Sequence, residues 1–137
     1  ISRQIRKFKP DVLITLDPAR SFEGNNYVGH PDHMASGEAA MSAVFPTARD
    51  RLTFPELLQE GLEPHKVREV WVAEYGEADH YVDVSDYMDT AVQALKQHQT
   101  QVNEADADTY MRQWRSSTGE KAGFEYAEAF KRIQIRR

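Results

Sequence analysis

The sequence predicts one α/β domain in which helices flank a mostly parallel β-sheet. Three observations favour this class. The apolar run DVLITLD at 11–17 lies between Pro10 and Pro18, which is typical of a fully buried strand in a parallel sheet. Helical patterns precede and follow this run, as in a helix–strand–helix alternation. At 137 residues, the chain is long enough for one domain with a hydrophobic core and too short for two comfortable ones.

The sequence of residues 1–45 predicts two helices, one before and one after the first strand. Residues 1–8 repeat apolar side chains at helical spacing and carry a basic outer face, and Lys9-Pro10 ends this helix because a residue before proline avoids the α region. Pro31 suits the first position of the second helix, with Asp32 at the positive end of its dipole. The predicted buried face of this helix comprises Met34, Gly37, Met41, Val44 and Phe45.

The remaining residues predict further short elements. We expect a short helix around Leu57 and Leu58, a second strand at 68–75 and a third at 80–84. Ser85 is predicted to cap a helix whose apolar face comprises Met88, Ala91, Val92 and Leu95. Another helix is expected at 110–114, and an amphipathic stretch from Gly123 leads to a closing strand at 132–135.

Composition excludes several classes of protein. Hydrophobic residues make up 40% and charged residues 28%, the balance of a globular chain, and the net charge of −5 gives no basic field for nucleic acid. The basic clusters near both ends are interpreted as solvated termini. There is no cysteine, so a metal site would use histidine or carboxylate ligands. No apolar run reaches membrane length and no signal peptide is recognisable, so the predicted location is the cytoplasm.

The motif GHPDH at 29–33 allows two interpretations. In the structural interpretation, His30 and His33 have no chemical role and simply lie in the first turn of a helix that begins at Pro31. In the chemical one, the two histidines project from the same side because they are three residues apart, and imidazole is a preferred zinc ligand. Asp32 could then hydrogen-bond a ring N–H and fix the tautomer. The spacing alone does not decide between them.

Four segments in order resemble the second half of the LmbE-like zinc deacetylases, the family of the N-acetylglucosaminylphosphatidylinositol de-N-acetylase. They are KPDVLITLDP, GHPDHMASGEAAMSAV, VDVSDYMDTAVQALKQHQTQ and GFEYAEAF. The resemblance implies a Rossmann-like sheet that is incomplete on its amino-terminal side. Residues 1–137 would then be the carboxyl-terminal part of one such domain, expected to hydrolyse the N-acetyl amide of an N-acetylglucosamine-type or related substrate with Zn²⁺.

The resemblance also implies roles for the histidine motif. His33 corresponds to a zinc ligand, His30 to the residue that stabilises or protonates the tetrahedral intermediate, and Asp32 to the acid that tunes His30. The family's HPDD motif, which supplies two further ligands and the base, has no counterpart here, and Val28 stands where some members have tyrosine. His98, near a predicted helix end, is interpreted as binding terminal carbonyls.

These inferences lead to expectations about partners and activity. The expected partners are a small N-acetylated substrate and either a second copy of the chain or a complementing chain, with no nucleic acid and no membrane span. The 137 residues alone are expected to be inactive. The alternative hypothesis is a non-catalytic α/β module that binds or interacts through part of the fold. A nucleotide-binding Rossmann domain ranks last because the sequence has no G-x-G-x-x-G motif.

Overall fold

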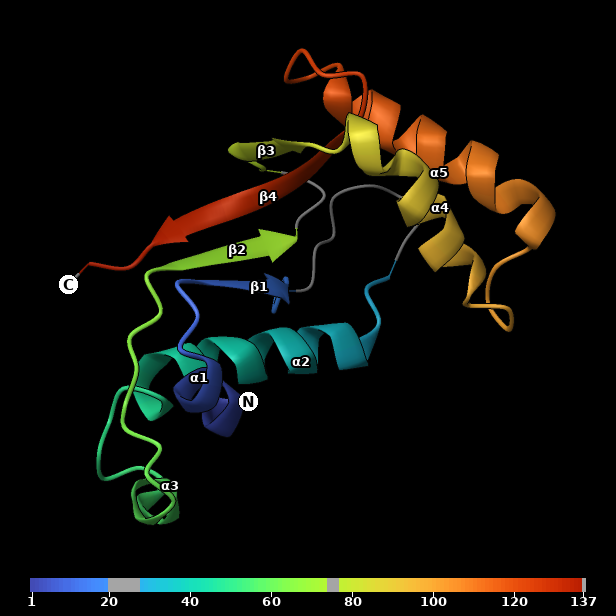
Figure 1. Cartoon of the computed structure of the whole chain (residues 1–137). Helices are drawn as coiled ribbons and strands as arrows, with labels where there is room; N and C mark the ends of the chain where they lie inside the picture. The colour runs from blue at the N-terminus through green and yellow to red at the C-terminus, as the bar shows by residue number, and fades with distance from the viewer. Residues whose placement is uncertain (20–27, 74–76, 137) are drawn as a thin grey trace. The chain divides into compact units, whose positions relative to one another are not determined.

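The computed structural model describes residues 1–19, 28–73 and 77–136 (Figure 1). Its elements are α1 (Ser2–Phe8), β1 (Val12–Leu16), α2 (Pro31–Ser42), the π-helical η1 (Ala43–Thr47), α3 (Pro55–Gln59), β2 (Glu69–Ala73), β3 (His80–Asp83), the 3₁₀ turn η2 (Ser85–Tyr87), α4 (Met88–Lys96), α5 (Glu104–Gly119) and β4 (Ala127–Gln134). The strands form an open sheet in the order β1-β2-β4-β3. The predicted class, an α/β sheet with helices, is confirmed. The sheet is mixed, because β1 and β2 pair in parallel whereas β3 and β4 are antiparallel.

The chain divides into two compact units. The first comprises Ile1–Glu77 with Lys131–Arg137, and the second comprises Ala78–Phe130. Each unit has an apolar cluster of its own. Within the ranges that the structure describes, no helix has the length and apolar character needed to cross a membrane.

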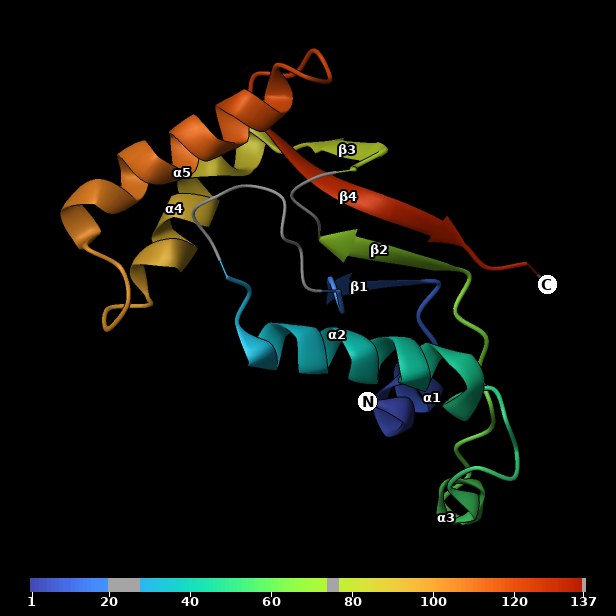
Figure 2. The ribbon, with the colours of Figure 1, turned by 180° about the vertical axis from the view of Figure 1, so that it is seen from behind.

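In the first unit, α2 lies in the connection between the parallel strands β1 and β2. Parallel neighbours need such a crossover, since a tight hairpin cannot join them. The register places Val12 opposite Glu69 and Leu16 opposite Ala73, and α2 packs on β1 (Figure 2). The buried cluster between helices and strands consists of Ile5, Ala43, Val44, Ala48, Val67, Val70 and Val72.

Strand β1 is present as predicted, but its predicted full burial is wrong. Leu13 packs against the core cluster, whereas Ile14 is 60% exposed, with Val12 and Leu16 on the same exposed face. Alternate residues of a strand point to opposite faces, and only the face toward α1 and α2 is covered. A continuous apolar run therefore indicates a strand, but does not show that both of its faces are covered.

Helix α1 differs from the prediction in which side chains it buries. Ile5 is buried, while Phe8 is 71% exposed and Arg6, expected on a solvated basic face, is only 1% exposed. The Arg6 guanidinium donates hydrogen bonds to the carbonyl oxygens of Ala48 (3.3 Å), Thr47 (3.0 Å), Asp50 (2.6 Å) and Thr53 (3.0 Å). Arg6 thus organises the irregular segment that joins η1 to α3.

The long second helix begins at Pro31, as predicted, and ends less regularly. After Ser42 the chain continues as η1, in which Phe45 has φ −145° and ψ 123°. This extended conformation, followed by Pro46, turns the Phe45 side chain outward, where it is 65% exposed and lies under the Arg49 guanidinium. The prediction that Phe45 belongs to the buried face is wrong, because helical periodicity holds only while the backbone stays helical.

The second unit packs α4 and α5 together beside the antiparallel pair β3–β4. Met88 and Val92 of α4 are buried against Met111, with Leu95 and Trp114 packed around them, as the apolar spacing predicts. Strand β4 is longer than the predicted 132–135 and buries Ala127 and Phe130. Helix α5 carries a capping asparagine, Asn103, whose side chain accepts the N–H of Ala105, a favoured arrangement at a helix start.

Ser85 does not cap α4 as predicted. It lies in the 3₁₀ turn η2, and Tyr87 occupies the N-cap position without a side-chain hydrogen bond. The Ser85 hydroxyl donates to Asp83 at 2.6 Å and accepts the N–H of Tyr126 at 3.2 Å. The serine therefore links the ends of β3 and β4, a contact between distant residues that local sequence does not show.

The ion pair between Glu69 and Arg132 predicts a dependence of stability on acid pH. Hydrogen bonds from Arg132 and then Trp71 lower the pKa of the Glu69 carboxyl from 4.5 to about 2. A carboxyl whose pKa is lower in the folded chain stabilises the fold above its unfolded pKa and loses this contribution as the pH falls. We expect the unfolding free energy to decline between pH 4.5 and about 2.

The measurement is chemical denaturation across this pH range. Glu69→Gln should be less stable than the wild type at neutral pH and show a shallower decline in acid. Glu125→Gln, which changes an exposed carboxylate, should retain the wild-type slope. An equal slope in Glu69→Gln and wild type would contradict the assignment.

Candidate active site

His30 is the N-cap of α2. Its backbone is extended (φ −67°, ψ 132°), and its Nδ1 accepts the backbone N–H of Asp32 at 3.1 Å. An imidazole nitrogen that accepts a hydrogen bond carries no proton, so this geometry places the ring proton of the neutral form on Nε2. Pro31 at the first helical position has no N–H to satisfy, which suits the start of a helix. Helix capping thus fixes the tautomer and turns Nε2 away from the backbone.

The Asp32 carboxylate does not make the hydrogen bond to a ring N–H that the sequence suggested. Its Oδ2 lies 3.8 Å from His30 Nδ1, beyond hydrogen-bonding distance, and the Asp32 side chain is 87% exposed. The backbone N–H of the same residue occupies Nδ1 instead. The Asp32 carboxylate therefore lies beside the ring without a hydrogen bond to it, and at this exposure solvent screens any charge interaction between the two groups.

His33 lies near His30, as their spacing predicts. The ring centres are 5.7 Å apart with an angle of 43° between the planes, and both residues are exposed. Rings at this distance can reach one small volume between them. The helix and its cap thereby present two imidazoles to the same region of solvent.

The histidines lie at the end of the first unit where β1 finishes. Asp17 follows β1 directly, and its Oδ1 accepts the N–H of Ala19 at 2.7 Å. The amino-terminal end of α2 is on the same side as the carboxyl end of β1 (Figures 1 and 2). Carboxyl ends of strands are where α/β proteins usually bind ligands.

The described residues do not complete a metal site. Among them, no group of three histidine, cysteine, aspartate or glutamate side chains could hold an ion. The two exposed imidazoles have the right donor chemistry for zinc, but a catalytic zinc needs three protein ligands. The donor type therefore fits zinc, whereas the number of donors among the described residues does not.

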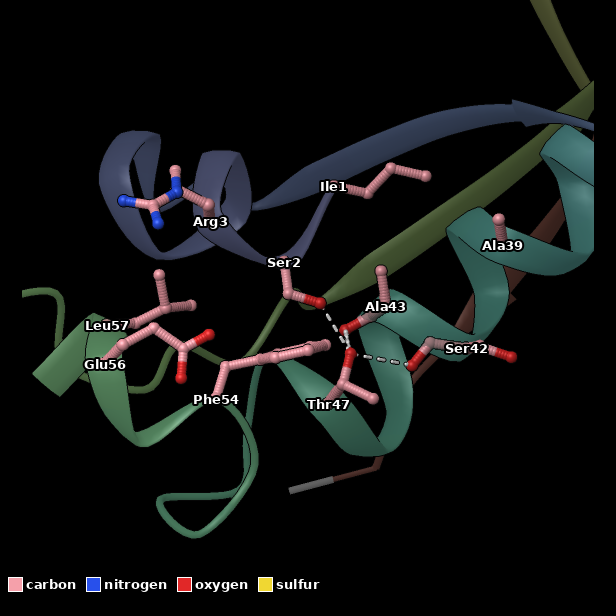
Figure 3. Close-up of a pocket in the computed structure, with 10 residues that line it drawn as sticks. All are labelled: Ile1, Ser2, Arg3, Ala39, Ser42, Ala43, Thr47, Phe54, Glu56 and Leu57. Atoms are coloured by element: carbon pink, nitrogen blue, oxygen red, sulfur yellow. Dashed lines mark hydrogen bonds between the residues drawn. The ribbon is translucent and has the colours of Figure 1, made fainter.

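A cavity of about 450 Å³ lies elsewhere in the first unit and contains neither histidine (Figure 3). It is lined by Ile1, Ser2, Arg3, Ala39, Ser42, Ala43, Thr47, Phe54, Glu56 and Leu57. The hydroxyl groups of Ser2 and Thr47, which both line this cavity, form a hydrogen bond of 2.5 Å. Its α2 residues belong to the last turn of the helix, far along the axis from His30. The lining offers no nucleophile–base pair, so the histidine motif remains the candidate site.

Val28 and His98 are the two other positions that the sequence singled out. Val28 is 75% exposed, and its neighbour Tyr27 lies outside the described residues. His98 is exposed beyond the end of α4, and its backbone N–H donates to Leu95 at 3.0 Å. The imidazole of His98 makes no hydrogen bond to a helix carbonyl in the described part of the chain, contrary to the interpretation above.

The open α/β sheet with its helices is the fold of the N,N′-diacetylchitobiose deacetylases. The enzyme of this name from Pyrococcus horikoshii, in complex with its inhibitor MPG, superposes with a TM-score of 0.81 at 24% identity, over 97% of this chain and 49% of the other. In sequence, the diacetylchitobiose deacetylase of Thermococcus kodakarensis is 29% identical over 131 residues, which are 93% of this chain and 46% of that protein. The chain thus spans just under half the length of this relative. No family model matches the sequence.

Two further proteins share the fold, and neither is named as a deacetylase. A conserved protein from Thermus thermophilus has a TM-score of 0.72 at 20% identity, over 99% of this chain and 58% of the other. GalB, the 4-carboxy-2-hydroxymuconate hydratase of Pseudomonas putida, has a TM-score of 0.68 at 15% identity, over 99% and 57%. The same fold therefore occurs in a deacetylase and in a hydratase, so the chemistry of a site depends on its side chains and not on the fold alone.

Proposed function

We propose that this chain forms part of a zinc-dependent deacetylase that hydrolyses the N-acetyl amide of an N-acetylglucosamine-type sugar or a related amide. The observation that carries the proposal is the similarity to a diacetylchitobiose deacetylase along 93% of the chain, which includes the histidine motif. The exposed imidazole pair beyond β1 supports it, because zinc-dependent amide hydrolysis needs groups that bind the metal and groups that move protons.

In this proposal, His33 binds the metal. Its ring is exposed at the end of β1 and free of the capping bond that occupies Nδ1 of His30. The other donors and the carboxylate base come from outside the described residues, from this chain or from a second copy or complementing chain. When bound, zinc would lower the pKa of a water molecule and polarise the acetyl carbonyl.

His30 acts on the substrate through Nε2. In amide hydrolysis, water adds to the carbonyl carbon, the oxygen becomes negative, and the C–N bond then breaks as the amine takes a proton. The Nε2–H of the neutral ring can donate a hydrogen bond to the negative oxygen. To pass a proton to the nitrogen, the ring must first be the doubly protonated imidazolium, which becomes neutral as it gives up the Nε2 proton. The Asp32 carboxylate lies 3.8 Å from Nδ1 of this ring. When both ring nitrogens of His30 carry a proton, Nδ1 can no longer accept the N–H of Asp32. Protonation of the ring therefore competes with its capping of α2.

His33→Ala tests the metal assignment. In protein from the complete reading frame that contains these residues, we expect bound zinc to fall to substoichiometric levels, because a protein ligand is lost. Zinc content by elemental analysis is the measurement. His98→Ala, which removes another exposed histidine, should retain the wild-type zinc content. A folded His33→Ala variant with unchanged zinc would contradict the assignment.

The second candidate is a non-catalytic module. The incomplete donor set of the described residues favours it. Release of acetate from N-acetylglucosamine or diacetylchitobiose by the wild-type protein with added zinc would exclude it. Zinc-loaded protein from the complete reading frame that releases acetate from neither substrate would contradict the deacetylase proposal instead.

A further inference from the structure

We propose that Gly37 is a positioning residue that sets how closely the amino-terminal half of α2, with both histidines, approaches the carboxyl end of β1. The inference rests on the proposed function, because it concerns the same two imidazoles. It adds a residue that contacts neither metal nor substrate.

Gly37 lies where α2 passes close to the end of β1. A Cβ at this position would lie 2.5 Å from the Leu16 carbonyl oxygen, 2.9 Å from the Pro18 nitrogen and 3.1 Å from the Asp17 carbonyl carbon. All three atoms belong to the backbone, so no side chain can rotate away to make room. Any residue with a side chain must push the helix and the strand apart.

The same contact determines where His33 stands. His33 precedes Gly37 by four residues, so it shares that face of α2 and lies about 6 Å farther toward the amino terminus. Helical side chains lean toward the amino terminus, which carries the imidazole beyond the end of the strand. His30 is tied to the same helix through its cap.

Little else in the described chain holds the imidazoles. Both rings are exposed, and His33 is not packed in the core. Their positions therefore follow the placement of α2, while the Asp17–Ala19 hydrogen bond fixes the facing turn at the end of β1. Catalytic groups misplaced by about 1 Å can lose about 10²-fold in rate.

The test compares Gly37→Ala with Gly119→Ala. A Cβ at Gly119 would meet the Phe124 and Glu125 backbone at 2.5, 2.9 and 3.1 Å, the same distances as at Gly37, but in α5 of the other unit. The two variants therefore carry a matched steric change. Both are made in protein from the complete reading frame and assayed for stability, for kcat and KM on diacetylchitobiose with added zinc, and for the imidazole NMR signals of His30 and His33.

We expect both variants to lose stability, and only Gly37→Ala to lower kcat, by about 10²-fold, and to shift both imidazole signals. Equal kinetic losses in the two variants, or unshifted imidazoles in Gly37→Ala, would overturn the positioning role. So would a Gly37→Ala variant that unfolds while Gly119→Ala folds, because this would assign Gly37 to stability alone. If the wild type does not cleave the amide, the proposed function fails and the imidazole signals alone decide the positioning role.

Discussion

Replacing His30 with alanine is expected to lower the turnover of the proposed deacetylase by about 10²–10⁴-fold, the usual loss for a general acid or base. Zinc occupancy should persist, because His33 and not His30 is the proposed ligand. The measurement is steady-state hydrolysis of an N-acetylated sugar together with zinc analysis, on protein from the complete reading frame. Loss of zinc in parallel with activity would make His30 a ligand instead.

A second variant separates catalysis from capping. His30→Ala also removes the acceptor for the Asp32 N–H, which costs about 0.5–2 kcal/mol of stability at an N-cap. Asparagine is a good N-cap residue, so His30→Asn should be close to the wild type in stability and as inactive as the alanine variant. Wild-type activity in His30→Asn would show that His30 only caps the helix.

Replacing Arg6 with methionine is expected to lower the unfolding free energy by about 3–4 kcal/mol. Methionine fills much of the same space, but the carbonyl oxygens of Thr47, Ala48, Asp50 and Thr53 lose a charged donor. Hydrogen bonds to charged groups contribute about 1.5–3 kcal/mol each, and shared contacts of one side chain do not add fully. Urea denaturation measures the change.

Arg3 is the control for Arg6 within the same helix. Its side chain is 48% exposed and pairs with Glu60 at the surface, where ion pairs contribute little. Arg3→Met should therefore unfold close to the wild type. Similar losses in the two variants would show that helix charge, and not the buried contacts of Arg6, stabilises this region.

Local sequence patterns predicted the elements because their causes are local. Pro10 after Lys9 ended α1, where Lys9 adopts φ 50° and ψ 52°. Pro31 began α2, and the spacing of Met88, Val92 and Leu95 identified the buried face of α4. Each of these depends on backbone sterics or on residues within a few positions of one another.

The errors occurred where distant segments meet. Whether Arg6 is solvated depends on the carbonyls of residues 47–53, which lie more than forty positions away. Whether Ile14 is covered depends on what packs on the outer face of β1. Ser85 bonds Tyr126 and not the helix that follows it. None of these contacts can be predicted from the spacing of apolar residues along the sequence.

For the candidate site, the sequence by itself determined the chemistry and the spacing: two imidazoles three residues apart at the start of a helix, with an acid between them. The tertiary structure decided how they can be used. The cap occupies Nδ1 of His30, so that Nε2 is the ring nitrogen left to meet another group, and the Asp32 carboxylate lies too far from the ring for a hydrogen bond. The backbone contact at Gly37 sets both rings against the end of β1. Helical spacing says which side chains share a face, but only packing against another segment says what that face meets.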